Sequence, residues 1–164
     1  NKHLILKKIC DQIPKTDKVI IFVNWKKSIG AIRNLFDENE YIILNGSSNK
    51  SQVINTFNTN PECRYLISSI IAGGTGLNLQ IANHVIIVEP TWNPAIERQA
   101  IDRCYRMGQT KQVYIYNLHS HATIECWMNN LINNKNDISY SFNENVFLNN
   151  INGITTSIHS NLNK

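Results

Sequence analysis

The most informative absence in this 164-residue sequence is that of a phosphate-binding loop. No Gly-x-x-x-x-Gly-Lys-Ser/Thr pattern occurs, and no Asp-Glu pair follows a strand-like apolar run. The sequence therefore offers neither a cradle for the β- and γ-phosphates of a nucleotide nor carboxylate ligands for the Mg²⁺ that accompanies them. We expect this stretch of chain to hydrolyse no ATP by itself.

Paired cysteines and long hydrophobic runs are also missing. The four cysteines are scattered with no Cys-x-x-Cys pair, which argues against a metal site or a disulfide framework and favours a reducing compartment. No apolar run approaches the roughly 20 residues that span a membrane, and the N-terminus lacks a signal-peptide pattern. The first residue is Asn, so we expect a piece of a longer chain.

The length fits one domain of ordinary size with a proper core. A net charge of +4 and a pI near 8.9 fit a nucleic-acid partner but do not require one.

Short apolar runs alternate with helical patterns along the first 131 residues. This alternation predicts a doubly wound, mainly parallel α/β sheet of about five to six strands flanked by helices. The expected strands are residues 19–23, 41–44, 64–68, 85–88 and 113–118. The expected helices are residues 4–9, 26–38, a segment around 53–57, 95–106 and 123–131. Residues 132–164 are rich in asparagine and predict a tail that is poorly ordered or docks on a missing domain.

Polar and glycine-rich segments follow four of the predicted strands. Ligands of parallel sheets sit beyond the carboxyl ends of the strands. We therefore expect the contacts made by the segments after these strands to lie along one edge of the sheet.

Two arginines stand close together in the predicted helix 95–106, in the sequence Gln99-Ala100-Ile101-Asp102-Arg103-Cys104-Tyr105-Arg106. Residues three apart project from one face of a helix, and Gln99 one turn earlier shares that face. Guanidinium groups carry a rigid fork of donors that suits phosphate oxygens. The cluster has the charge that a phosphoryl-transfer site needs, whereas an Arg-x-x-Arg pattern without such a context is in most cases a solvated basic helix.

Four motifs in order resemble those of the C-terminal ATPase lobe of SWI/SNF-type DNA translocases. Residues 20–25 resemble motif IV, and Leu44-Asn45-Gly46-Ser47 resembles the element that follows it. Residues 73–79 resemble motif V, and residues 99–106 resemble motif VI. The Trp-Asn-Pro of residues 92–94 and the Arg-x-Gly-Gln of residues 106–109 narrow the match to this branch. The resemblance covers residues 2–130 and implies the second, RecA-like lobe of a P-loop NTPase.

By this resemblance the chain supplies one wall of an ATP site. Arg103 and Arg106 would be catalytic arginine fingers that face the γ-phosphate, and Gly76, Asn78 and Gln99 would join them in contacting ATP. ATP and Mg²⁺ would be held mainly by the N-terminal lobe of the same polypeptide.

The resemblance also implies a surface for double-stranded DNA. Its residues would be Asn24, Gly46, Ser47, Lys50, Ser69, Gly73, Trp92 and Asn93. Composition alone leaves open that Trp92 is a core tryptophan in front of a helix-starting proline, and we expect Trp25 to be packed.

Two departures from the family pattern concern DNA affinity. Ile70 and Ile71 stand where relatives carry a cation, which predicts weaker binding and a salt dependence shallower by about one unit. Lys50 replaces an arginine, and so keeps the charge without the bidentate fork.

We therefore expect the C-terminal half of an ATP-dependent double-stranded DNA translocase of the chromatin-remodelling, repair or transcription-termination type. Its partners would be DNA and the N-terminal lobe, with nucleosomes or transcription machinery as further candidates. The alternatives are a strand-separating helicase lobe and a free-standing DNA- or protein-binding lobe without ATPase activity. The expected location is the nucleus, with a cytoplasmic, viral or bacterial source as alternatives.

Overall fold

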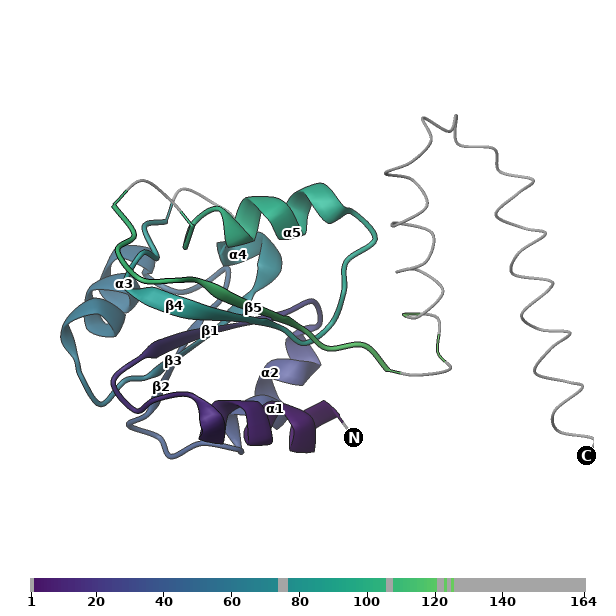
Figure 1. Cartoon of the computed structure of the whole chain (residues 1–164), viewed down its shortest axis with the longest axis horizontal. Coiled ribbons are helices and arrows are strands. Elements are labelled where there is room, and N and C mark those ends of the chain that lie inside the picture. Colours follow the sequence, from purple (N-terminus) through teal and green to yellow (C-terminus); the bar gives the residue numbers. More distant parts are fainter. Residues whose placement is uncertain (1, 74–76, 106–107, 121–122, 124, 126–164) are drawn as a thin grey trace, which may run out of the picture. The chain divides into compact units, whose positions relative to one another are not determined.

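Five parallel strands form the centre of the fold (Figure 1). They are β1 (Lys18–Val23), β2 (Tyr41–Leu44), β3 (Tyr65–Ser69), β4 (Ala82–Ile87) and β5 (Tyr114–Asn117), in the order β2-β3-β1-β4-β5. The computed structural model describes residues 2–73, 77–105, 108–120, 123 and 125. All of these belong to one compact unit, Asn1–Asn129.

The central strands are buried because helices cover both faces of the sheet. Every residue of β4, and every residue of β1 after Lys18, is buried. The run Val19–Val23 in β1 and the run that starts at Val85 in β4 are continuous and apolar, which is the pattern of parallel strands with two covered faces.

Helices pack on the two faces in two groups (Figure 1). Helices α1 (Lys2–Gln12) and α2 (Lys26–Arg33) cover one face, and their buried side chains include Leu6 and Ile32. The other face is covered by α3 (Lys50–Thr59), α4 (Ile70–Gly73) and α5 (Pro94–Ile101), which bury side chains such as Phe57 and Ala100. The parallel, two-faced α/β fold predicted from the sequence is confirmed.

Helix ends are where the structure differs from the sequence predictions. The helix expected over 26–38 ends at Arg33, because the amides of Leu35 and Phe36 bond three residues back and tighten the chain into a turn. The short α4 was not predicted. The predicted helix 123–131 and the predicted tail 132–164 fall mainly or wholly outside the described residues, so the domain boundary at 131 stays a prediction.

A polar cluster joins three strands at their amino ends. Asp17, just before β1, accepts a hydrogen bond from Asn83 Nδ2 at 2.9 Å and lies 3.3 Å from His84 Nε2, both on β4. Its second oxygen is 2.6 Å from Lys111 Nζ, which precedes β5. These contacts, led by the hydrogen bond from Asn83, lower the pKa of Asp17 to about 2. Burial lowers the pKa of His84, against the opposing effect of Asp17.

The lowered pKa of Asp17 makes the stability of the chain depend on pH. A carboxylate whose folded pKa is depressed stabilises the fold above its unfolded pKa, about 4, and that contribution is lost as the pH falls through the folded value. We expect the urea midpoint of the wild-type chain to fall more steeply between pH 4 and pH 2 than that of Asp17→Asn. The control is Asp11→Asn, since Asp11 makes a solvent-exposed pair with Lys7 and should leave the steepness unchanged. Equal slopes in the wild type and Asp17→Asn would contradict the expectation.

Candidate functional site: one edge of the sheet

The strand register places the ends of four strands side by side. Val23 pairs with Ser69, Leu44 pairs with Ser68, and Phe22 pairs with Ile87. The segments that follow β1, β2, β3 and β4 therefore start from the same edge, which we call the carboxyl edge. It carries most of the residues expected to contact DNA: Asn24, Gly46, Ser47, Lys50, Ser69, Trp92 and Asn93.

Glu89 lies in the segment after β4 and is hydrogen-bonded to the segment after β1. Its Oε2 accepts hydrogen bonds from the backbone N–H groups of Asn24 and Trp25, both at 3.0 Å, and its Oε1 accepts one from the hydroxyl of Ser28. A carboxylate is well placed there, because the N-terminus of α2 exposes unpaired N–H groups. Sequence reasoning missed Glu89. Its role depends on β1 and β4 being neighbours, an order that the sequence did not reveal.

The tryptophans of the carboxyl edge are both exposed. Trp92 keeps 56% of its surface accessible, so its reading as a core residue is wrong. Trp25 is 65% exposed, and our expectation that it packs is also wrong. Beside Trp92, the side chain of Asn93 caps α5 by accepting from the amide of Ala95 at 3.0 Å. The Trp-Asn-Pro sequence thus starts a helix and presents an aromatic surface at the edge.

The turn after β2 is stabilised by Asn45. Its Oδ1 accepts from the amide of Ser47 at 3.0 Å and from the hydroxyls of Ser47 and Ser48 at 2.8 and 3.0 Å. Asn49 then caps α3 by accepting from the amide of Gln52, and Lys50 is the first residue of that helix. This geometry fixes the turn that carries Gly46 and Ser47.

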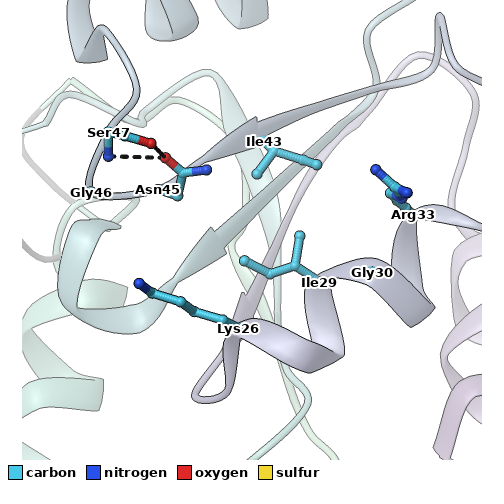
Figure 2. A pocket seen from close by; sticks show the side chains of 8 residues that line it. All are labelled: Lys26, Ile29, Gly30, Arg33, Ile43, Asn45, Gly46 and Ser47. Carbon is cyan, nitrogen blue, oxygen red and sulfur yellow. Dashed lines mark hydrogen bonds between the residues drawn. The ribbon is translucent and has the colours of Figure 1, made fainter.

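A pocket of about 420 Å³ opens between α2 and the turn after β2. Figure 2 shows Lys26 and Arg33 at its two ends on α2, with Ile29 and Ile43 between them. Gly30 also lines the pocket, and an added Cβ there would meet nothing within 4 Å. Neither cation pairs with a carboxylate in the described part of the chain. Sequence reasoning missed both cations, although their seven-residue spacing on a helix was a readable signal.

In the segment after β3, side-chain packing explains why residue 73 is a glycine. Ser69 accepts from the amide of Ala72 at 3.3 Å and so starts α4. Gly73 is buried, and a Cβ there would lie 2.4 Å from Cε1 of Phe22. Packing thus requires a glycine at this position, while its contact with DNA stays a prediction. Ile71, one of the two residues expected to depart from the family pattern, is 68% exposed.

Arg103 does not lie on a helix. The predicted helix 95–106 ends at Ile101, and residues 102–105 form a turn that buries Cys104 against the sheet. The predicted extension of this helix to residue 106 is therefore wrong, and the common face of Gln99 and Arg103 stays a prediction. Gln99 itself is exposed on α5.

The side chain of Arg103 has no partner for one of its donors. Its Nε is buried without a hydrogen-bond acceptor, and no carboxylate pairs with Arg103 among the residues described. The carbonyl of Arg103 accepts from the amide of Leu79 at 3.3 Å, which joins this turn to the segment that holds the exposed Asn78. Arg106 and Gly76, the other residues expected at the nucleotide, lie outside the described residues.

The described residues show no metal site of their own. They contain no group of three or more His, Cys, Asp or Glu residues that could hold an ion. In the same residues, no helix has the length and apolar character needed to cross a bilayer.

The fold is a parallel α/β domain that carries two exposed tryptophans at its carboxyl edge, with the Arg103 turn bonded to the segment leading into β4. The family description "Helicase conserved C-terminal domain" matches residues 1–108. The chain belongs to this family.

Its relatives are much longer proteins. The chain is 38% identical over 127 residues to the "ATP-dependent helicase ULS1" of Saccharomyces cerevisiae, a match that covers 74% of this chain and 8% of ULS1. It is 36% identical over 129 residues to "Transcription termination factor 2" of Drosophila melanogaster, covering 75% and 12%. Among solved structures, the C-terminal part of the Fun30 ATPase domain superimposes with a TM-score of 0.75 at 34% identity, covering 79% of this chain and 44% of that one. The resemblance to SWI/SNF-type ATPase lobes is confirmed.

Proposed function

We propose that this chain is the C-terminal lobe of an ATP-dependent double-stranded DNA translocase, and that Arg103 is an arginine finger. The observation that carries the proposal is the buried, unpartnered Nε of Arg103, in a turn that is bonded to the segment leading into β4. A buried donor without an acceptor costs free energy, so its persistence favours a missing acceptor such as a phosphate oxygen. Arg106, by the resemblance, would act beside it.

The residues of this lobe fit one half of an ATP site. Asn78 and Gln99 are exposed and can donate to a nucleotide, and Arg103 can stabilise the charge that develops on the γ-phosphate. Nucleotide binding and the metal ligands would come from the N-terminal lobe. When bound there, ATP with Mg²⁺ would supply the reacting phosphoryl group. This lobe would place the positive charge of Arg103 across the cleft from that group.

The DNA surface would run along the carboxyl edge. The backbone N–H of Gly46 and the N-terminus of α3 at Lys50 suit phosphate oxygens, and Ser47, bonded to Asn45, would support the turn beside them. Ser69, Trp92 and Asn93 extend the same edge, and Glu89 fixes the backbone around Asn24. Closing the two lobes on ATP and opening them after hydrolysis would shift this surface along the duplex.

The direct test is DNA-stimulated ATP hydrolysis by the full-length protein, followed by two motor assays. A translocase displaces a triplex-forming strand without separating the duplex, whereas a helicase separates the duplex. Triplex displacement that requires ATP is the expected result. Duplex unwinding would favour the helicase lobe, and DNA binding without ATP turnover would favour a pure binding module.

Replacing Lys50 tests the predicted DNA path. In full-length Lys50→Ala we expect weaker DNA binding, and a plot of log affinity against log salt shallower by about one unit, with little change in basal ATP hydrolysis. Lys15→Ala is the control, since Lys15 is exposed before β1, at the opposite edge of the sheet. Fluorescence anisotropy over a salt series measures both variants. An unchanged slope for Lys50→Ala would remove Lys50 from the DNA surface.

The relatives suggest the biological setting. Their names include a chromatin-remodelling ATPase, a DNA repair protein and a transcription termination factor. We infer that the full-length protein works in the nucleus on chromatin or on transcription complexes. Chromatin fractionation of the native protein tests the location.

A further inference from the structure

The Gly108-Gln109 pair follows the arginine turn and has no role in the proposed function so far. The side-chain amide of Gln109 contacts three backbone carbonyl groups that come earlier in the chain. Gln109 Nε2 donates to the carbonyls of Gln80 and Ala82 at 2.7 and 3.0 Å, and lies 3.5 Å from that of Cys104. Gln80 precedes β4, Ala82 is the first residue of β4, and Cys104 belongs to the arginine turn.

The backbone conformation of Gly108 allows the side chain of Gln109 to make these hydrogen bonds. Its φ of +104° lies in the region that side chains disfavour. The backbone can thus reverse direction directly before Gln109. The other end of the Gln109 amide is fixed as well, because its Oε1 accepts from the amide of Lys111 at 3.0 Å.

A second bond joins the same two segments. The amide of Leu79 donates to the carbonyl of Arg103 at 3.3 Å. Residues 77–82 are thereby connected to the arginine turn twice, once through Arg103 itself and once through Gln109. We call this arrangement the Gln109 clamp.

We propose that Gln109 is a positioning residue that holds the Arg103 turn against residues 77–82. The proposal rests on the proposed role of Arg103. An arginine finger works only where its guanidinium meets the developing charge, and a displacement of about 1 Å costs on the order of 100-fold in rate. Arg103 stands in a turn rather than in a helix, so its position depends on such bonds.

The test uses the full-length protein carrying Gln109→Met, which keeps the length of the side chain and removes its polar atoms. We expect the kcat of DNA-stimulated ATP hydrolysis to fall roughly 10- to 100-fold, while the KM for ATP and the affinity for DNA stay within about threefold. Hydrogen exchange of the Leu79 amide should become faster. Gln112→Met is the matched control: Gln112 is exposed, its only hydrogen bond given by the structure is from the hydroxyl of Tyr114, and its loss should change none of these quantities.

A merely structural role would give a different pattern. The melting temperature of Gln109→Met would then fall, and its kcat would decrease in proportion to the folded fraction. Hydrogen exchange of all core amides would become faster together. That outcome, or an unchanged kcat, overturns the proposal. If Gln109→Met does not fold, Gln109→Asn, whose amide is one methylene shorter, should fold and show the same loss of kcat at constant KM. A wild-type protein without DNA-stimulated hydrolysis would instead refute the proposed function, whereas the exchange of Leu79 would still report on the clamp.

Discussion

Full-length protein carrying Arg103→Ala should lose ATP turnover almost completely while it still binds DNA. An arginine finger contributes ~10³–10⁵ in rate, equivalent to about 4–7 kcal/mol of transition-state stabilisation. The residue lies half-buried in the turn after α5, and its carbonyl accepts from the amide of Leu79, which is not among the residues expected to contact DNA. We therefore expect kcat with saturating DNA to fall by that factor and DNA affinity to stay within about threefold. Steady-state ATPase kinetics and anisotropy measure the two.

Arg98→Ala is the matched control for this variant. Arg98 is an exposed arginine in the last turn of α5, five residues before Arg103, and it has no predicted role at the nucleotide. Its replacement should leave kcat close to that of the wild type. Turnover near the wild-type rate in Arg103→Ala would refute the assignment of the finger.

Gly73→Ala should destabilise the lobe through a single added methyl group. Alanine is the better helix former, so propensity alone predicts a gain for this residue of α4. A Cβ at this position would instead lie 2.4 Å from the ring of Phe22, which is fully buried on β1. Overpacking of a filled core typically costs about 1–3 kcal/mol, and we expect a loss of that size in urea denaturation of the 164-residue chain.

Two further variants separate this clash from other causes. Phe22→Leu frees space at the ring position, so the double variant should be more stable than the sum of the two single losses predicts, by about 1 kcal/mol. Gly30→Ala adds the same methyl group to helix α2 where nothing lies within 4 Å, and should stabilise the chain by up to about 1 kcal/mol. Additive losses in the double variant would show that the contact with Phe22 is not the cause.

The sequence predicted the strands well because their signal is local. Residues 19–23 and 85–87 are buried, and a continuous apolar run is the direct consequence, whereas the polar Asn83 and His84 hid the start of β4. The alternation of such runs with helical patterns then gave the parallel α/β fold and its carboxyl edge. None of this required knowledge of the strand order.

What the sequence did not predict depends on contacts between distant segments. Glu89 holds the N-terminus of α2 because β4 lies beside β1, and Gln109 reaches residues 80 and 82 because the chain reverses at Gly108. The helix predicted through Arg103 ends at Ile101, where the amides of Arg103 and Cys104 bond three residues back and Cys104 enters the core. Each of these features follows from tertiary packing, which overrides the local helical pattern.

The central claim is that Arg103 stabilises a transition state on a nucleotide held by another lobe. It is tested most directly by the affinity of the full-length protein, with DNA, for ADP alone and for ADP with aluminium fluoride, which mimics the transferring phosphoryl group. A residue that acts in the transition state should matter for the mimic and little for ADP. We predict that Arg103→Ala binds ADP within about threefold of the wild type but binds the mimic at least 100-fold more weakly. Equal affinities of the variant and the wild type for the mimic would contradict the account.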